Sequence, residues 1–171
     1  GWTGAHPHDA LEKAMESASA QEYDALLTAH LADYRALYDR FALDLGTTPA
    51  DALDLPTYER VLRVREGAAD PDLEEVLYQF ARYLMIAASR RGTQPMNLQG
   101  IWNDNPNPWW DSKYTININL PMNYWPAESG NLAEMVEPLE RFTHEVAAAG
   151  TATAREHWNA RGWVLHQNTD L

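Results

Sequence analysis

The sequence has 171 residues, 45% of them hydrophobic and 22% charged, a composition typical of a folded globular protein and not of a disordered one. Its formal net charge of −12 argues against nucleic acids and anionic membranes as partners, because phosphate contacts need clustered lysine and arginine. The chain has no cysteine, which excludes disulfide and thiolate chemistry, and no apolar run long enough to span a membrane. The length fits one domain or part of a larger one.

The first half of the chain shows the periodicity of α-helices. Its apolar residues recur at helical spacing in four segments: residues 9–18, 26–41, 57–65 and 71–90. Asp70 and Pro71 form a favourable start for the last segment, because an acidic residue caps a helix and proline is tolerated in the first turn. The wide apolar stripe of the second segment is the pattern of a helix packed into a bundle. These segments predict an all-α fold.

Residues 92–111 interrupt the helical pattern. They contain three prolines, four asparagines, two glycines and three tryptophans, and they have no helical period. A loop of about twenty residues is uncommon in a compact domain unless it has a function. Helical spacing resumes near Met122 and continues to Trp158, with a kink or a new first turn predicted at Pro138. Residues 162–166 are predicted to be short and extended.

Polar and apolar residues alternate in the segment 114–120, YTININL. Because side chains at i and i+2 share one face of an extended backbone, Thr115, Asn117 and Asn119 are predicted to face the same way. Two amides that project from a stretched backbone into a cavity bordered by aromatic rings would suit the binding of a sugar. The tryptophans that lie nearby in the sequence are Trp102, Trp109, Trp110 and Trp125.

Several stretches of the chain resemble one enzyme family. They are residues 97–103 (NLQGIWN), 109–114 (WWDSKY), 117–128 (NINLPMNYWPAE) and 162–170 (GWVLHQNTD), together with the upstream residues 34–46. These stretches are similar to glycoside hydrolase family 95, the inverting 1,2-α-L-fucosidases and their relatives. The resemblance covers essentially the whole chain, and the pattern N-x-N-x-x-x-N-Y-W is its most specific part.

The resemblance implies an (α/α)6 toroid or barrel with long active-site loops and short extended segments. Residues 1–171 would be the N-terminal part of that catalytic domain, with a β-sandwich and the later barrel helices outside this chain. In the family the two asparagines, here Asn117 and Asn119, position and polarise the hydrolytic water. A neutral amide is too weak a base to take a proton, but its carbonyl can orient a water while a carboxylate polarises the amide.

The same resemblance places the general acid Glu and the activating Asp beyond Leu171. Glu128 and Asp170 do not match the motifs of those two groups. We therefore expect no turnover by these 171 residues alone, and we expect the remainder of the catalytic domain to be needed as a partner. No cofactor and no metal are expected, since neither metal-ligand spacing nor a phosphate-binding glycine loop is present.

The implied substrate is an oligosaccharide with a terminal α-L-fucose or α-L-galactose. Thr115 stands where many fucose-cleaving relatives carry His, and a smaller hydroxyl side chain leaves room for the extra hydroxyl of L-galactose. His166 has polar neighbours at the alternate positions Asn168 and Asp170, so His166 and Asn168 are candidates for the same pocket. The substrate class suits a soluble, secreted or extracytoplasmic protein, although the sequence leaves the localisation open.

Each candidate residue also has a purely structural interpretation. The asparagines can satisfy backbone groups in an irregular crossing, the tryptophans can pack in a core, and His166 can act as a structural hydrogen bonder. One of Asp104 and Asp111, which flank the tryptophan-rich loop, could bind sugar hydroxyls, but loop acids are usually solvated. Residues 6–8 are expected to form an exposed N-terminal turn. Two other functions remain open on the sequence alone: a sugar-binding domain without catalysis, and a scaffold of stacked helix pairs.

Overall fold

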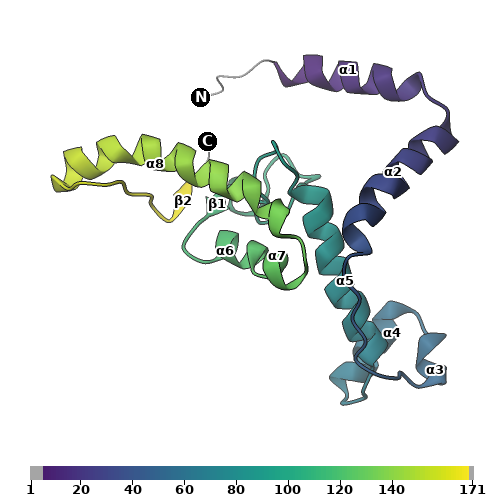
Figure 1. The fold of residues 1–171 in the computed structure, drawn as a ribbon. Helices are drawn as coiled ribbons and strands as arrows, with labels where there is room; N and C mark the ends of the chain where they lie inside the picture. The colour runs from purple at the N-terminus through teal and green to yellow at the C-terminus, as the bar shows by residue number, and fades with distance from the viewer. Residues whose placement is uncertain (1–5, 170–171) are drawn as a thin grey trace. The chain divides into compact units, whose positions relative to one another are not determined.

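The computed structural model describes residues 6–169, which divide into two compact units, one ending at Asp39 and one beginning at Arg40. The described chain is mostly helical, as predicted, with a single pair of very short strands among its described residues (Figure 1). Within the described range, no helix combines the length and the apolar character that a membrane crossing requires.

The first unit contains two helices, α1 (Pro7–Ser19) and α2 (Tyr23–Tyr38). Both were predicted, although α1 begins two residues before Asp9 because Pro7 occupies its first turn. The ring of His6 caps this helix, since its Nδ1 accepts a hydrogen bond from the His8 backbone N–H at 3.2 Å. Residues 6–8 are exposed, as predicted, but they form the start of a helix and not a separate turn.

The second unit begins with an irregular segment and the short helices α3 (Ala50–Leu53) and α4 (Thr57–Arg65). Helix α4 has the predicted bounds. The long helix α5 (Pro71–Ala88) begins at the predicted Asp70–Pro71 step, where the Asp70 carboxylate accepts a hydrogen bond from the Leu73 backbone N–H at 3.1 Å. One face of α5 is buried, including Met85, and its C-terminal end is followed by Ser89, which is fully buried.

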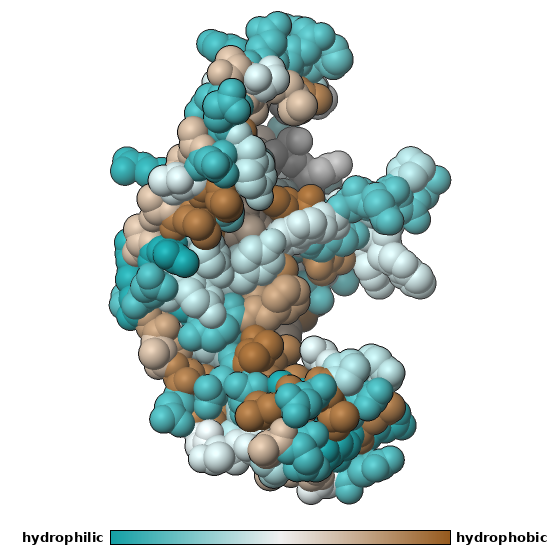
Figure 2. Space-filling view, turned by 90° about the vertical axis from the view of Figure 1, so that its right-hand side faces the viewer, coloured by the Kyte–Doolittle hydropathy of each residue, from teal (hydrophilic) through white to brown (hydrophobic). Residues whose placement is uncertain are grey.

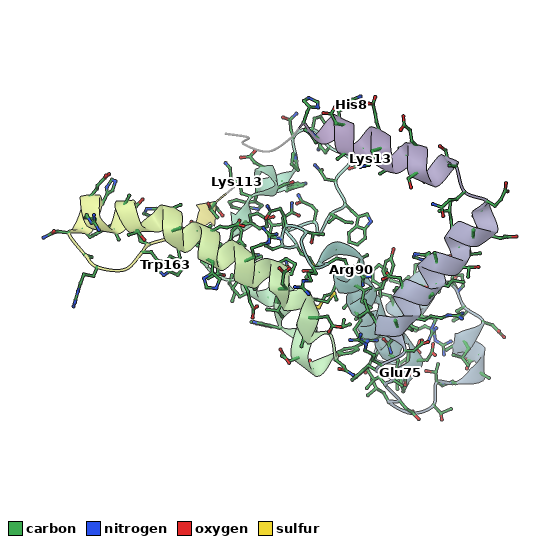
Figure 3. All side chains as sticks on the ribbon, turned by 45° about the horizontal axis from the view of Figure 1, so that its top comes forward. His8, Lys13, Glu75, Arg90, Lys113 and Trp163 are labelled. Carbon is green, nitrogen blue, oxygen red and sulfur yellow. The ribbon has the colours of Figure 1, made fainter. Side chains whose placement is uncertain are left out.

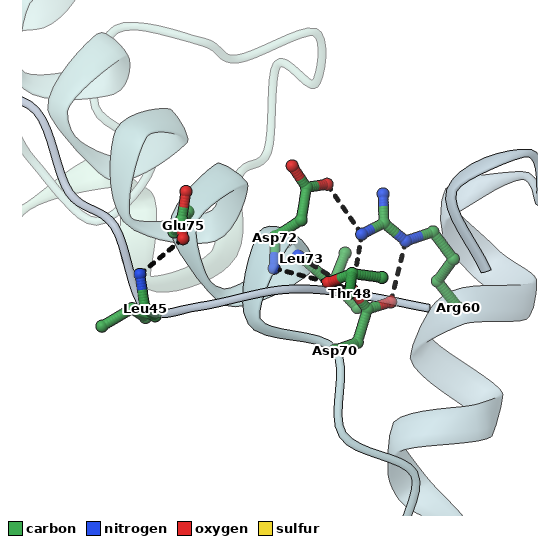
Figure 4. A network of polar contacts seen from close by, with 7 residues as sticks. All are labelled: Leu45, Thr48, Arg60, Asp70, Asp72, Leu73 and Glu75. Atoms are coloured by element: carbon green, nitrogen blue, oxygen red, sulfur yellow. Dashed lines mark hydrogen bonds and ion pairs between the residues drawn. The ribbon is translucent and has the colours of Figure 1, made fainter. Parts of the chain in front are cut away.

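A cluster of charged groups closes the N-terminal end of α5 (Figure 4). The Arg60 guanidinium of α4 donates to both Asp70 carboxylate oxygens, at 2.8 and 2.6 Å, and to Asp72 at 2.8 Å. The Thr48 hydroxyl donates to Asp70 and accepts from the Asp72 backbone N–H, both at 2.9 Å. These contacts join the irregular segment, α4 and α5 into one corner of the unit.

The C-terminal half of the unit folds back on α5 through short elements and one long helix. They are the 3₁₀ helix η1 (Trp109–Ser112), β1 (Tyr114–Thr115), α6 (Asn119–Tyr124), α7 (Pro126–Ser129), the 3₁₀ helix η2 (Ala133–Val136), α8 (Glu137–Trp158) and β2 (Asn168–Thr169). Pro138 lies in the first turn of α8, so it marks a new helix, one of the two outcomes predicted. Residues 159–167 then return along α8 toward β1 (Figure 1).

The core of this unit lies between α5, α6 and α8. Its buried members include Met85, Ile86, Leu120, Tyr124, Leu132, Met135, Phe142 and Val146. Outside this core many large apolar side chains stay exposed, and Figure 2 shows apolar residues interspersed among polar ones on the surface. One such area on the second unit is a groove of about 510 Å³ between α4 and α5, lined by residues that include Val61, Leu77 and Phe80.

Candidate active site

The segment 114–120 is extended over only its first two residues. After Thr115 the chain turns, and α6 begins at Asn119, where the Met122 backbone N–H already donates to the Ile118 carbonyl at 3.0 Å. The prediction of one continuous strand is therefore wrong beyond Thr115. The helical spacing of Leu120 and Tyr124, both buried in the core, prevails over the alternation of polar and apolar residues.

Asn117 and Asn119 consequently leave the backbone from a turn and a helix start. Asn117 is exposed within the turn, and Asn119, the first residue of α6, is half-buried. Thr115 is buried in β1, and its Oγ1 has no hydrogen-bond partner among the residues that the structure describes. The turn is fixed at its start, because the Ile116 backbone N–H donates to the Gln167 carbonyl at 2.9 Å.

The strand pair β1–β2 brings the C-terminal motif to this turn. The strands are antiparallel, with Tyr114 opposite Thr169 and Thr115 opposite Asn168. Asn168 is thus directly beside Thr115, although its own side chain is exposed. His166 lies two residues earlier, also exposed, with its ring 5.7 Å from the ring of Trp158.

Helix α8 supports the segment that leads to β2. At Gly150 an added Cβ would lie 2.3 Å from the Val164 carbonyl oxygen, and the Val164 backbone N–H donates to the Gly150 carbonyl at 3.3 Å. Figure 3 shows Trp163 on this returning segment beside α8. A glycine in the middle of α8 therefore lets the chain approach closely enough to reach β1.

The four predicted tryptophans lie on loops and helix ends and are exposed within the described residues. Trp109 and Trp110 in η1 are 83% and 66% exposed, and Trp125, between α6 and α7, is 66% exposed. Trp102 packs against its own loop, since a Cβ at Gly100 would lie 2.9 Å from its ring, and it approaches the Tyr83 ring at 6.3 Å. None of the four is a buried core residue of this chain.

Two cavities flank the candidate segment. One of about 520 Å³ is lined by residues that include Asn97, Gln99, Trp102 and Asn123, and one of about 390 Å³ by residues that include Ile116 and Trp163. Neither of these two cavities is lined by Asn117 or Asn119. In the first cavity the Gln99 Oε1 atom is buried without a hydrogen-bond partner among the described residues.

The backbone before β1 has an unusual conformation. Trp110, Asp111 and Ser112 have φ angles of 58°, 56° and 54°, which lie in the left-handed region that residues other than glycine rarely adopt. The Asn97 side chain stabilises this run by donating to the Ser112 carbonyl at 3.2 Å. Such conformations often occur at functional sites, where surrounding contacts hold them in place.

Two tyrosines that were not predicted as site residues lie on the elements that flank the turn: Tyr114 in β1 and Tyr124 in α6. Burial raises the pKa of Tyr114 to about 12 and also raises the pKa of Tyr124. Both hydroxyls are therefore protonated at neutral pH and can donate: Tyr114 donates to the Pro95 carbonyl at 3.1 Å. The sequence signal for Tyr124 was its place in the N-Y-W motif, but nothing in the sequence indicated its partners.

The candidate acids have ordinary surface positions. Asp104 is exposed, Asp111 forms an ion pair with Lys113 at 3.1 Å, and Glu128 is exposed in α7. Lys113, which directly follows η1, is labelled in Figure 3. Asp170 lies outside the described residues. Within residues 6–169 no group of three or more acidic or histidine side chains is arranged to hold a metal ion.

Comparison with known proteins agrees with the motifs. Residues 22–171 match the glycosyl hydrolase family 95 catalytic domain. The chain is 40% identical over 159 residues to alpha-L-fucosidase 2 of Arabidopsis thaliana. The aligned region covers 92% of this chain and 19% of that protein. It is 34% identical over 165 residues to the probable alpha-fucosidase A of Aspergillus niger, covering 95% of this chain and 21% of the relative.

A third relative shows the same relation. The chain is 34% identical over 170 residues to the probable alpha-fucosidase A of Aspergillus oryzae, which covers 98% of this chain and 24% of that protein. The chain thus spans about a fifth to a quarter of the length of these relatives. With a family match over most of its residues, this chain belongs to glycosyl hydrolase family 95, within the catalytic domain.

Proposed function

We propose that the full-length protein is an inverting glycosidase that removes terminal α-L-fucose or α-L-galactose from oligosaccharides. Residues 1–171 would form the N-terminal part of an (α/α)6 catalytic domain, and the remainder of that domain would supply the general acid and the activating carboxylate. The relatives named α-fucosidases support the sugar class. The many exposed apolar side chains of this chain support the need for further parts of the domain.

The observation that carries the proposal is the anchored turn between β1 and α6. It begins at a backbone hydrogen bond to Gln167 and ends in the first turn of α6, so its backbone is held at both ends. Asn117 is exposed on it and Asn119 follows at the helix start. Amides on a held backbone that water can reach are suited to orienting a nucleophilic water against an anomeric carbon.

An inverting reaction needs room for that water. Acid and base groups in inverting glycosidases stand about 6.5–9.5 Å apart so that a water fits between the base and the sugar. Here the amides would take the place of the base and would depend on a carboxylate hydrogen-bonded to one NH2 group. We propose that both asparagine carbonyls bind the attacking water, which would keep the nucleophile on the face opposite the leaving group.

Substitution of the asparagines tests this proposal. Asn117→Ala and Asn119→Ala in the full-length protein are expected to lower kcat by about 10²–10⁴-fold, because the water loses its orienting acceptors. The assay uses the nitrophenyl α-L-fucoside and α-L-galactoside, and proton NMR of the first product establishes the anomeric configuration. Asn107→Ala removes an exposed amide from the neighbouring loop and serves as the matched control.

The same assay separates the alternative functions. If both asparagine variants keep wild-type kcat, or if the first product retains its configuration, the water-positioning role is wrong. Binding of either sugar that changes tryptophan fluorescence without any product would instead identify a non-catalytic sugar-binding domain. If neither binding nor product is detected, the helical-scaffold function is the one that remains.

Thr115 provides a test of the sugar that is accepted. Its buried Oγ1 atom lacks a partner among the described residues, and such a group is stabilised by a hydrogen bond from a ligand. We propose that this hydroxyl forms a hydrogen bond with the extra hydroxyl of an α-L-galactoside. Thr115→Val keeps the shape of the side chain and should lower kcat/KM for the galactoside more than for the fucoside. An equal effect on both substrates would contradict this assignment.

A further inference from the structure

A buried chain of hydrogen bonds runs behind the candidate turn. The Met96 backbone N–H donates to the Tyr124 hydroxyl at 3.0 Å, and the Tyr124 and Ser89 hydroxyls lie 2.8 Å apart. The Ser89 hydroxyl donates to the Met135 carbonyl at 2.8 Å, so its oxygen is the acceptor for the Tyr124 hydroxyl. All four residues are buried, and each hydroxyl accepts once and donates once.

The residue before Tyr124 holds the same loop. The Asn123 side-chain amide donates to the Asn97 carbonyl at 2.9 Å and to the Met96 carbonyl at 3.4 Å. Asn123 and Tyr124 are consecutive in α6, the helix that begins at Asn119. The loop at residues 95–97 is therefore attached to α6 through both its N–H and its carbonyl groups.

The same loop also holds the other side of the turn. The Tyr114 hydroxyl donates to the Pro95 carbonyl at 3.1 Å, and Asn97 donates to the Ser112 carbonyl at 3.2 Å. Tyr114 belongs to β1, which leads into the turn, and its ring packs against Phe142 at 4.7 Å. Residues 95–97, which we name the anchor loop, thus contact the elements on both sides of the turn that carries Asn117.

We propose that Tyr124, assisted by Asn123, is a positioning residue that sets the spacing of Asn117 and Asn119 through the anchor loop. The inference rests on the proposed role of the two asparagines. Helix α6 has only six residues, too few to be stable on its own, so its start is placed by its tertiary contacts. Without the Tyr124 hydroxyl the anchor loop loses its N–H partner, and α6 can shift relative to β1.

The expected consequence is a loss of rate and not of substrate affinity. A misplacement of about 1 Å at a reacting group can lower the rate by about 100-fold. Tyr124→Phe keeps the buried ring and removes only the hydroxyl. In the full-length protein we expect kcat to fall by about 10- to 100-fold while KM changes by less than about threefold.

A buried hydrogen-bond network also contributes to stability, so the test needs a control with a similar defect elsewhere. Thr48→Val removes a buried hydroxyl from the charged cluster at the other end of α5. An α5 of 18 residues spans about 27 Å, so this control lies far from Tyr124. It should lower the thermal midpoint as Tyr124→Phe does, while its kcat stays within about twofold of wild type.

The outcomes separate the two proposals. Loss of kcat in Tyr124→Phe but not in Thr48→Val supports the positioning role. Wild-type kcat in Tyr124→Phe, with inactive Asn117→Ala and Asn119→Ala proteins, overturns the positioning role and leaves the proposed function intact. A wild-type protein that hydrolyses neither glycoside overturns both. If Tyr124→Phe fails to fold, Asn123→Ala decides instead, because it removes the bonds from α6 to the Asn97 and Met96 carbonyls: a fall in kcat supports the role, and wild-type kcat overturns it.

Discussion

The two ends of α5 are stabilised in different ways. At its N-terminal end, Arg60, Asp70 and Thr48 form a buried charged cluster in which each group has a partner (Figure 4). At its C-terminal end, Ser89 and Tyr124 form a neutral chain of hydroxyls that holds the anchor loop. The charged end has the features of a structural joint, whereas the neutral end adjoins the candidate site.

Unpaired polar atoms occur at the second end. Three buried side-chain atoms lack a hydrogen-bond partner among the described residues: Gln99 Oε1, Ser112 Oγ and Thr115 Oγ1. Gln99 lies two residues after the anchor loop, Ser112 ends η1, and Thr115 belongs to β1. The left-handed residues of η1 lie there as well. Since buried polar groups are nearly always paired, this concentration favours the region as the place where a polar ligand or further protein is received.

The largest expected effect on stability comes from disrupting the charged cluster at the N-terminal end of α5. Arg60→Met leaves the Asp70 carboxylate buried without its guanidinium partner, and an unpaired buried charge is strongly destabilising. We expect the greatest fall in thermal midpoint among the variants considered, measured by circular dichroism, without a matching fall in kcat at temperatures where the protein is folded. Arg63→Met on the same helix removes an exposed pair with Asp51 and should have little effect. Similar midpoints for the two variants would contradict a structural role for the cluster.

A smaller effect on stability is expected where α8 contacts the segment that leads to β2, together with a larger effect on activity. In Gly150→Ala the new methyl group meets the Val164 carbonyl, so the segment leading to β2 must move. Such overpacking costs about 1–3 kcal/mol. We expect kcat to fall more than in Arg60→Met, because β2 is the partner of the strand that precedes Asn117. Thr151→Ala, on the next residue of α8, is the control, and unchanged kcat in Gly150→Ala would separate β2 from the site.

The smallest effects are expected in the pH dependence of stability, with opposite signs at the two ends. Hydrogen bonds from Arg60 hold the pKa of Asp70 well below its ordinary 3.8, so the stability it contributes is present above that pH and lost as the pH falls below it. Burial raises the pKa of Tyr114 to about 12 from 10.0, so its contribution is full below pH 10 and lost as the pH rises toward 12.

Thermal midpoints measured across both pH ranges check these signs. Arg60→Met should flatten the acid limb alone, since it removes the cause of the lowered Asp70 pKa. Tyr114→Phe should flatten the alkaline limb alone, since phenylalanine does not ionise. A variant that changes the opposite limb would contradict the assignment of that limb to its residue.

Local patterns were sufficient to predict most of the longer helices. The apolar spacing and the Asp70–Pro71 step predicted α2, α4 and α5, because caps, proline and periodicity act within a few residues. Pro138 predicted either a kink or a new first turn, and the structure has the new first turn, at the start of α8. The family motifs also indicated which segments carry the candidate site. The sequence by itself therefore determined the fold class and the family of this chain.

Only the tertiary structure decided how the candidate site is built. The alternation at 114–120 predicted a longer strand, but β2 pairs with β1 over only two residues, and burial of Leu120 and Tyr124 converts the rest to a turn and a helix. The partners of Tyr124 come from a helix end, a loop and η2. Such contacts join residues far apart in the sequence, and their geometry depends on how the surrounding elements pack, which no local pattern encodes.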